Sequence, residues 1–390
     1  MKKVVQHICL VSDHILPNLI PILEKKPEFV HLVVSAEKSH VGKRFTQILE
    51  NLNINYKIYP NAPVSNVQEI YFFAENVLNQ IISCLNNESL VFNATAGTKP
   101  MAMAFSNIIQ QYPNAKIIYT NTYHSLLEYL HPIGHPPDHL PGVLDVKTYL
   151  SAQNIQLKFC DSDDIVWQKD VFSRAELTFL MAKKAGFNGH LFGILNALSQ
   201  KACNRSSDML VDPCQEFDRP VHNKYWQQIL TSMANQELIE WDELSKVQFN
   251  TIEAANYIGG GWLEEYAWLI AKNNNVDDVR LGVNVKTCDG NRCHVPNEHD
   301  VIIVHNNRLL HIECKTVNYQ KFSYLGKDLS YKMDSTGAKI GGLFGNNVLL
   351  SVWNLPSHQL ERANTYGIDV LAAQKLDSFD VFLKDWIASS

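Results

Sequence analysis

Two acidic residues and a lysine stand out because their types and spacing suit metal-assisted chemistry on a phosphate group. They are Asp300, Glu313 and Lys315, and they lie in the stretch NEHDVIIVHNNRLLHIECKT, residues 297–316. Carboxylate oxygens are the ligands that hard divalent ions such as Mg²⁺ and Mn²⁺ prefer. A neighbouring lysine can donate to an attacking water or to negative charge that develops on a phosphate.

The same stretch predicts a β-hairpin that would bring the two acids together. Asn306-Asn307 suits a two-residue turn because Asn tolerates a positive φ, and in the register that this turn sets Asp300 lies opposite Glu313. Opposed Cβ atoms are about 4.5–5.5 Å apart, so the two carboxylates need a shared proton or a cation. A three-residue turn would shift this register, and a solvated Glu313–Lys315 pair on a surface hairpin is the simpler alternative. Alternation along the strands assigns to the core Val301, Ile303, Leu310, Ile312 and Cys314.

A further acid precedes the hairpin on a helix. In GGGWLEEYAWLIAK, residues 259–272, three glycines break the chain and a helix begins at about Trp262. Glu264 and Glu265 then fall in its first turn, where the helix dipole favours carboxylates. Helix geometry alone makes the two equal candidates for a fourth site residue, and both could simply be charges at a helix start.

The whole chain has the composition of an ordinary globular protein. It has 390 residues, which is enough for two or three domains, with 46% hydrophobic and 19% charged residues. Its sequence contains no run of 18 apolar residues, and its eight cysteines follow no framework spacing, which suits reduced thiols in the cytoplasm. The net charge of −6 excludes strong unspecific binding of nucleic acid over the whole surface, so any such contact must come from a local patch.

The first 145 residues alternate between strand-like and helix-like segments. Short apolar runs such as FVHLVVSAE and AKIIYTNT alternate with helical patterns, which predicts a parallel, Rossmann-like sheet. Two loops would leave strands at the edge where such sheets bind ligands, namely SDH after the first strand and NATAGTKP at residues 93–100. In the second loop, small residues and Lys99 precede a helix start, which favours a phosphate, although a tight strand-to-helix connection is the simpler alternative.

Two clusters of histidine and cysteine are weaker candidates for a metal site. The segment EYLHPIGHPPDHLPG, residues 128–142, has histidines at four-residue spacing, but its prolines prevent the helix that would align them. We interpret it as a proline-rich connector. The second cluster matches no zinc-finger spacing and consists of Cys288, Cys293 and His294.

The remaining segments divide into a helical part and a C-terminal part. Residues 165–248 are mostly helical with a terminal strand, and this pattern resembles a winged-helix module. We expect the module to act as a spacer between domains, because no dense basic run marks a recognition helix. Whether it contacts nucleic acid stays open.

These motifs together resemble a known family. The pattern D-x12-E-C-K resembles the PD-(D/E)xK restriction-endonuclease-like superfamily. With NATAGTKPM and GGWLEE, the whole chain resembles the CRISPR-associated Rossmann-fold (CARF) nucleases, closest to the single-CARF, single-nuclease ancillary effectors of type III CRISPR systems. The resemblance implies an α/β protein with a CARF domain at 1–150, a linker and winged-helix-like segment at 151–250 and a nuclease domain at 251–390.

The resemblance also implies roles for particular residues. Glu264, Asp300 and Glu313 would bind Mn²⁺ or Mg²⁺, and with Lys315 they would form the catalytic site. The positions that fall on the ligand-binding loops are Ser12, Asp13, Asn93, Thr95, Ala96, Gly97, Thr98 and Lys99. Ala96 is a departure, since the family loop commonly has a second glycine there.

The implied function is a cyclic-oligoadenylate-activated, metal-dependent nuclease of antiviral defence. Its activator would be cyclic tetra-adenylate, because an even-numbered ring matches a two-fold homodimer. Its substrates would be single-stranded DNA or RNA, with nicking of duplex DNA, and the sequence leaves the choice between DNA and RNA open. The alternative is a ligand-responsive winged-helix transcriptional regulator with an inactive nuclease fold. The sequence also leaves open whether the CARF pocket cleaves its own ligand.

Overall fold

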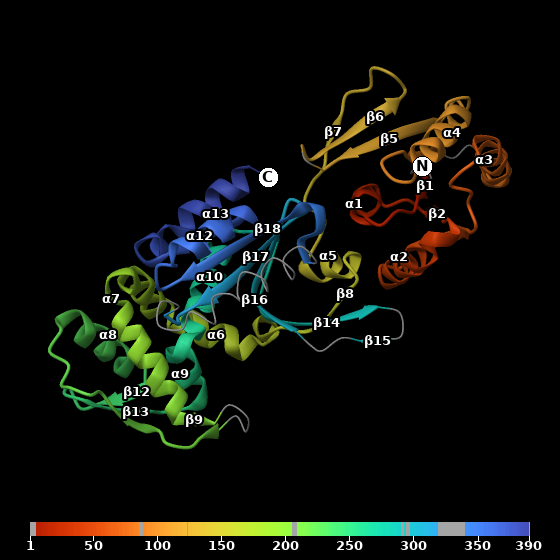
Figure 1. Cartoon of the computed structure of the whole chain (residues 1–390). Coiled ribbons are helices and arrows are strands. Elements are labelled where there is room, and N and C mark those ends of the chain that lie inside the picture. The colour runs from red at the N-terminus through yellow and green to blue at the C-terminus, as the bar shows by residue number, and fades with distance from the viewer. Residues whose placement is uncertain are drawn as a thin grey trace.

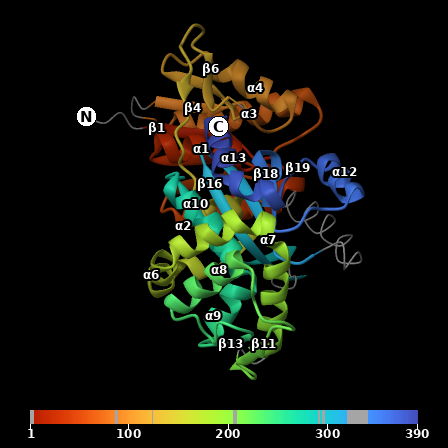
Figure 2. The same cartoon turned by 90° about the vertical axis from the view of Figure 1, so that its left-hand side faces the viewer.

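The computed structural model describes residues 5–85, 89–122, 124–204, 209–289, 292–293, 297–318 and 340–389. The molecule is elongated, and three parts follow one another along its length (Figures 1 and 2). The sheet of the first 140 residues forms one end, and the helical segment around α7 and α8 forms the other. The C-terminal sheet lies between them, although it comes last in the chain.

The N-terminal part is a seven-stranded sheet with the order β3-β2-β1-β4-β5-β6-β7. Its first five strands are parallel, and β5, β6 and β7 pair antiparallel. The predicted Rossmann-like sheet is therefore confirmed. The strands are β1 Val5–Leu10, β2 Phe29–Val33, β3 Asn55–Tyr59, β4 Ser89–Asn93, β5 Ala115–Asn121, β6 Leu126–His131 and β7 Asp138–His139.

Helices cover both faces of this sheet because its strands are apolar on both sides. Cys9 of β1 packs in one hydrophobic cluster with helices α1 and α2, whereas Ile8 and Leu10 pack in another with α3 and α4. The order of strands reverses between β1 and β4, so the loops after these two strands diverge at the carboxyl edge. The four helices are α1 Leu16–Lys25, α2 Ser39–Asn51, α3 Val67–Ile82 and α4 Lys99–Ile109.

The proline-rich stretch is more than a connector. Its two ends form the antiparallel strands β6 and β7, which extend the N-terminal sheet. The interpretation as a plain connector was therefore wrong, because an extended segment can add to a sheet edge even where prolines prevent a helix. In the other predicted cluster, His294 and the side chains of Cys288 and Cys293 lie outside the described residues.

The segment after the N-terminal sheet belongs structurally to the C-terminal one. Strand β8 (Ile155–Phe159) pairs with β14 (Asp278–Asp289) of the C-terminal sheet. Helix α5 (Val146–Ala152) lies before it, and its Tyr149 and Leu150 pack in one cluster with Val41 and Phe45 of α2 and with Leu309. A continuous hydrophobic core thus joins the two sheets.

The central segment contains a long helix, a shorter helix and a small sheet, as in a winged-helix module. Helix α7 (Ala175–Ala202) packs in one hydrophobic cluster with α8 (Lys224–Asn235) and with α10 of the C-terminal part. Because this core is shared, the central segment is firmly attached to the C-terminal part. Its remaining elements are α6 Ile165–Ser173, β9 Cys203–Asn204, β10 Met209–Leu210, β11 Cys214–Glu216, β12 Ile239–Trp241 and β13 Lys246–Phe249.

The C-terminal sheet has the strand order β15-β14-β16-β17-β18-β19, with β8 added along β14. Both faces of its central hairpin are buried, since Val301 and Leu310 belong to one core cluster and Ile302 and Leu309 to the other. Its other elements are α9 Ile252–Asn256, α10 Trp262–Asn273, β15 Arg292–Cys293, β16 Asn297–His305, β17 Arg308–Lys315, β18 Gly345–Ser351, α12 Ser357–Thr365, β19 Ile368–Ala372 and α13 Phe379–Ala388.

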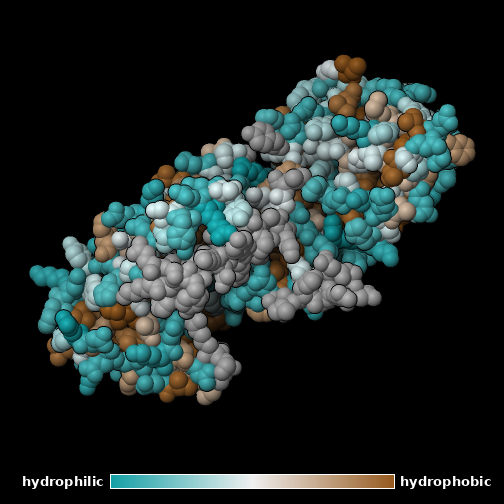
Figure 3. All heavy atoms as spheres, viewed as in Figure 1, coloured by the Kyte–Doolittle hydropathy of each residue, from teal (hydrophilic) through white to brown (hydrophobic). Residues whose placement is uncertain are grey.

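The surface is largely hydrophilic on the face shown in Figure 3. Hydrophobic atoms protrude at the tip of the hairpin between β6 and β7, where Ile133 is 93% exposed. In the described part of the chain, no helix combines the length and the apolar character needed to cross a membrane.

Candidate nuclease site and ligand loops

The hairpin that carries the acids has the predicted turn and register. Asn306 and Asn307 adopt φ values of 46° and 63°, and the strands pair from His305–Arg308 to Val301–Ile312. The pairing ends there, one residue short of the predicted Asp300–Glu313 pair. The Asp300 carboxylate instead accepts a hydrogen bond from the Cys314 N–H at 2.6 Å.

Lys315 lies between the two acids. Its Nζ is 2.6 Å from Glu313 Oε1 and 3.2 Å from Asp300 Oδ2, and it also donates to the Cys314 carbonyl. The Glu313 side chain is only 4% exposed, while those of Asp300 and Lys315 are 18% and 24% exposed. Burial and the charge of Glu313 raise the pKa of Asp300, although Lys315 and the Cys314 N–H lower it. The lysine therefore offsets only part of the repulsion between the acids.

The structure separates the two glutamates of α10. Glu264 lines the same cleft as Lys315, and burial and the charge of Asp300 raise its pKa well above its usual range. Glu265 instead accepts two hydrogen bonds from Arg174, at 2.9 and 2.5 Å. Burial raises the pKa of Glu265 more than the bond from Arg174 lowers it. The Glu265 carboxylate, in turn, raises the pKa of Arg174 despite burial, so we treat the two groups as an ion pair. Glu264 is therefore the helix acid that joins the predicted site.

The glycines before α10 allow the helix to begin where it does. Residues Tyr257–Gly261 form a π-helical turn, and Gly260 has φ +153°. A Cβ at Gly260 would lie 3.0 Å from Thr316 Oγ1, so glycine lets this turn approach the end of β17. Irregular turns of this type are often found at functional sites.

Glu264 and Lys315 line an open cleft of about 940 Å³ between the C-terminal sheet and the central segment. Asp300 and Glu313 are bonded to this lysine. The cleft has polar walls, and the residues that line it include Arg174, Asn196, Gln200, Glu264, Lys315 and Thr316. Within the residues that the structure describes, no group of three or more His, Cys, Asp or Glu side chains already surrounds a metal position. Lys315 occupies the space between two of the carboxylates that we predict as ligands.

A buried histidine pair beside the acids was not predicted. His299 Nδ1 is 3.1 Å from His311 Nε2, and His311 Nδ1 is 3.2 Å from Asn347 Oδ1. Burial lowers the pKa of His311 although the charge of Glu313 raises it, so the ring is neutral. In the sequence HIECK, His311 and Glu313 are two residues apart, which places both on one strand face. This spacing could have indicated that a histidine lies beside the acids.

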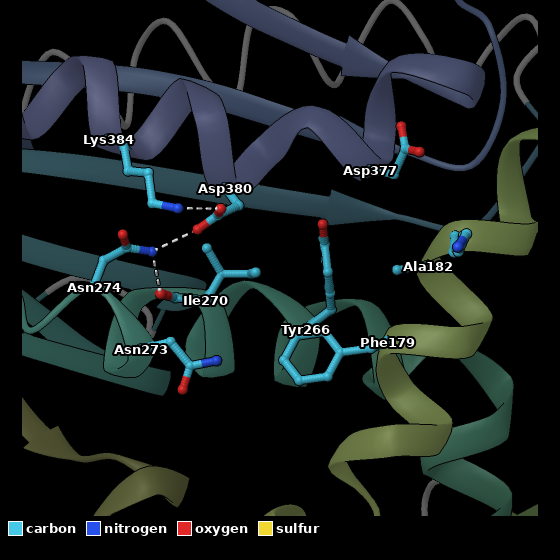
Figure 4. Close-up of a pocket in the computed structure, with 10 residues that line it drawn as sticks. Phe179, Ala182, Tyr266, Ile270, Asn273, Asn274, Asp377, Asp380 and Lys384 are labelled. Atoms are coloured by element: carbon cyan, nitrogen blue, oxygen red, sulfur yellow. Dashed lines mark hydrogen bonds and ion pairs between the residues drawn. The ribbon is translucent and has the colours of Figure 1, made fainter.

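A second hollow on α10 has a different character (Figure 4). Tyr266 and Ile270 line it, and Asp380 there is bonded to Lys384 and Asn274. Glu264 is two residues before Tyr266, or about 200° around the helix, so it points to the opposite side. Asp380, the acid that α13 contributes to this hollow, is already paired with Lys384. We therefore assign the site to the larger cleft.

The predicted ligand loops of the N-terminal sheet lie next to each other. Cys9 at the end of β1 pairs with Asn93 at the end of β4, so the loops with Ser12 and Asp13 and with residues 95–99 leave neighbouring strands. Thr98 caps α4 by accepting a bond from the Met101 N–H, and Lys99 is exposed. The arrangement has the phosphate-binding geometry of a helix start at a sheet edge.

Not all of the predicted loop residues are accessible. Asn93 is fully buried, and its amide bonds Pro17, Thr120 and Thr95, so it holds the loop from inside. Ala96 is also buried, whereas Gly97 is exposed with φ +85°. A side chain at position 97 would meet Leu10 at 2.6 Å, so the loop requires glycine at this point.

Two cations near the loops were missed. Lys38 forms an ion pair with Asp13 at 2.8 Å, and Arg44 donates to the Asp13 carbonyl at 3.4 Å. Among the residues that the structure describes, the buried Nε of Arg44 has no hydrogen-bond partner, and burial lowers the pKa of the Arg44 guanidinium. Lys38 and Arg44 follow β2, which also ends at the carboxyl edge of the sheet. Their position after that strand could have indicated that both cations lie near the loops.

Glu264→Gln is expected to stabilise the metal-free protein near pH 8. Its folded-state pKa lies above the unfolded value of about 4.3, so the ionised carboxylate costs stability once the pH rises through the folded-state pKa. Below the unfolded pKa both states are protonated, and the difference disappears. Melting in EDTA near pH 8 and near pH 4 measures the effect.

The adjacent Glu265→Gln is the matched control, with the opposite sign. It leaves the Arg174 guanidinium without its anion, and removing one partner of a buried pair costs about 3–5 kcal/mol. A Glu264→Gln protein that melts below wild type near pH 8 would contradict the assignment.

Comparisons with known protein families match two parts of the chain. Residues 6–149 match the model of the Card1 CARF domain, and residues 251–390 match that of the Card1-like endonuclease domain. The chain is therefore a CARF-domain nuclease, which confirms the resemblance read from its motifs. Both of its matched domains are of the Card1 type.

Solved structures share the fold over nearly the whole chain. Protein VC1899 from Vibrio cholerae has a TM-score of 0.84 and 20% identity, with 99% of this chain and 98% of that chain covered. Can2 from Sulfobacillus thermosulfidooxidans, in complex with cyclic tetra-adenylate, has a TM-score of 0.75 and 21% identity, with 99% and 97% covered. A type III CRISPR defence DNA nuclease activated by cyclic oligoadenylate has a TM-score of 0.54 and 13% identity, with 90% and 46% covered. No curated protein sequence matches the chain significantly.

Proposed function

We propose that this protein is a cyclic-oligoadenylate-activated, divalent-metal-dependent nuclease of type III CRISPR defence. The observation that carries the nuclease part is the group of Asp300, Glu313 and Lys315 beside Glu264, within a domain of the Card1-like endonuclease type. Its substrates are single-stranded DNA or RNA, with nicking of duplex DNA as a further activity. We propose domains at 1–150, 151–250 and 251–390, with β8 of the middle segment contributing to the nuclease sheet.

The carboxylates fit a divalent ion. Glu264, Asp300 and Glu313 supply the oxygen donors that Mn²⁺ and Mg²⁺ prefer, and a cation, Lys315 Nζ, already lies between two of them. Burial and the charges of the neighbouring acids raise the pKa values of Glu264 and Asp300 more than Lys315 lowers them. When bound, the ion would lower the pKa of a water and polarise the phosphate.

The chain's own residues have distinct parts in this proposal. Glu264, Asp300 and Glu313 would hold the ion. Lys315 moves from between Asp300 and Glu313 toward the substrate, where its ammonium donates to the phosphate oxygen that gains charge. His299 and His311 are both buried, and His311 lies on the same strand face as Glu313, so the pair would shield that carboxylate from water on one side.

The activator is a cyclic oligoadenylate, of which the four-adenosine ring best fits a homodimer. Each of two chains would contribute the same loops to a two-fold ring. Ser12, Thr95, Gly97, Thr98 and Lys99 lie at the accessible carboxyl edge. Lys38 and Arg44 add positive charge there, and Asp13 holds both of them near the loops. Asn93 and Ala96 shape the loop from within.

The path from activator to nuclease runs through a direct junction. The side-chain amide of Asn307, in the turn of the catalytic hairpin, donates to the Pro141 carbonyl at 2.8 Å and accepts from the Val143 N–H at 2.9 Å. Asp278 at the start of β14 accepts from the Val146 N–H at 3.0 Å. Movement of the N-terminal sheet would thus reach the hairpin without passing through the central segment.

Cleavage assays with and without the activator test this proposal. Labelled single-stranded DNA, single-stranded RNA and duplex DNA are incubated with Mn²⁺, with and without cyclic tetra-adenylate. A ring that binds the active arrangement better by about 1–3 kcal/mol accelerates cleavage about 5–150-fold. Calorimetry should give one ring for two chains, and Lys99→Ala should activate poorly at limiting ring.

The other outcomes separate the alternatives. Equal rates with and without any ring would leave a constitutive nuclease and refute gating. Sequence-specific binding of duplex DNA without cleavage under any condition would favour a winged-helix regulator. Shortening of the ring itself during the assay would show that the CARF pocket also cleaves its ligand.

A further inference from the structure

Asn196 on α7 bridges the two segments that carry the proposed catalytic groups. Its Nδ2 donates to the Gly259 carbonyl at 2.5 Å and to Thr316 Oγ1 at 3.0 Å. Its Oδ1 accepts from Gln200 Nε2 at 2.6 Å. All of these bonds come from one side chain that is only 9% exposed.

Both bonded partners stand next to residues of the site. Gly259 lies in the π-helical turn that leads into Glu264, and Thr316 directly follows Lys315. The amide of Asn196 thus ties the helix acid to the end of the catalytic strand. Trp353 holds the same point from another side, since its Nε1 donates to the Thr316 carbonyl at 3.1 Å.

The glycines of the turn make this bridge sterically feasible. A Cβ at Gly259 would collide with Ser199, and a Cβ at Gly260 would press on Thr316 Oγ1. The turn therefore lies directly against α7 and against the residue that follows β17, and the Asn196 carboxamide bonds to both segments. A carboxamide can also donate two bonds in diverging directions, which a hydroxyl cannot do.

We propose that Asn196 is a positioning residue of the nuclease site, which sets the distance between Glu264 and Lys315. The inference rests on the proposed nuclease function, and it gives the central segment a part in the site beyond that of a spacer. Asn196 does not act on the substrate itself, because its donors are already used. Its effect comes from alignment, and a misplacement of about 1 Å can cost about 100-fold in rate.

The test compares Asn196→Leu with Ser199→Ala in the full-length protein. Ser199 lies one turn further along α7 and donates to the Ala255 carbonyl at 2.6 Å, so its loss removes a buried bond near the same turn but does not touch Thr316. Asn196→Leu is expected to lower kcat about 100-fold with little change in KM for substrate. Ser199→Ala should keep kcat near wild type at a comparable melting temperature.

Two further measurements keep the inference separate from the proposed function. Calorimetry with Mn²⁺ alone needs no cleavage, and Asn196→Leu should weaken Mn²⁺ binding while Ser199→Ala does not. The double variant Asn196→Leu with Thr316→Val should have a kcat no lower than that of the less active single variant, because both substitutions break the same bridge. A wild-type protein that fails to cleave would refute the nuclease function, whereas unchanged kcat and Mn²⁺ affinity in Asn196→Leu would overturn the positioning role.

Discussion

Asp300→Asn and Glu313→Gln are each expected to lower nuclease activity by about 1,000-fold, the equivalent of about 4 kcal/mol in the barrier. Either change removes a charged oxygen donor from the proposed metal site while it preserves the side chain's size. Both proteins should still fold and bind the ring, since the binding loops lie in the other sheet. Activity is measured as cleavage of labelled single strands with Mn²⁺ and ring, and metal binding is measured by calorimetry.

A matched acid in the same sheet serves as the control. Asp369 of β19 also has a pKa raised by burial, but it lies on the edge strand of the sheet, two strands away from β17, so Asp369→Asn should cleave like wild type. Lys315→Ala should retain Mn²⁺ binding and lose turnover, because the lysine neutralises the carboxylates only until the ion binds. Full activity in Asp300→Asn or in Glu313→Gln would refute the assignment of that residue.

Gly97→Ala is expected to weaken ring binding more than tenfold and to abolish activation at limiting ring. The added Cβ would lie 2.6 Å from Leu10 and would occupy a residue with φ +85°, so the loop must move away from the position that presents Thr98 and Lys99. A loss of about 1.4 kcal/mol or more in binding corresponds to that factor. Calorimetric titration with cyclic tetra-adenylate measures it directly.

Gly134→Ala isolates the effect of the clash from that of backbone strain. Gly134 has nearly the same φ, +84°, but a Cβ there meets no atom within 4 Å in the described part of the chain. The left-handed conformation costs each alanine about 1–2 kcal/mol in stability, so both proteins should lose at least this much. Gly134→Ala should nevertheless bind the ring like wild type. Equal weakening in both proteins would indicate a general loss of stability, and unchanged affinity in Gly97→Ala would remove this loop from the binding site.

Several features of the site could be predicted from short stretches of sequence. The turn at Asn306-Asn307 follows from the tolerance of Asn for positive φ, and it determined the register of the hairpin. The helix start at Trp262 follows from the preceding glycines. The alternation of strands and helices in the first 145 residues likewise indicated a parallel sheet with loops at one edge. Each of these depends on backbone chemistry within a few residues.

Other features depended on residues far apart in the chain, and only the tertiary structure decided them. The choice between Glu264 and Glu265 rests on Arg174, which lies 91 residues before Glu265 and occupies that carboxylate. Neighbouring helix positions differ in direction by about 100°, and sequence spacing alone does not say which direction faces the strands.

Contacts between residues far apart in the chain also decided three other features, namely the burial of Asn93, the cations beside Asp13 and the bridge from Asn196. Asn93 is satisfied by Pro17 and Thr120, and Asn196 by Thr316, which is 120 residues away. The sequence by itself determined the chemistry that was present and the local elements that carry it. The tertiary structure decided which side chains meet, because a polar group takes its role from the partners that burial brings to it, and those partners come from other elements of the fold.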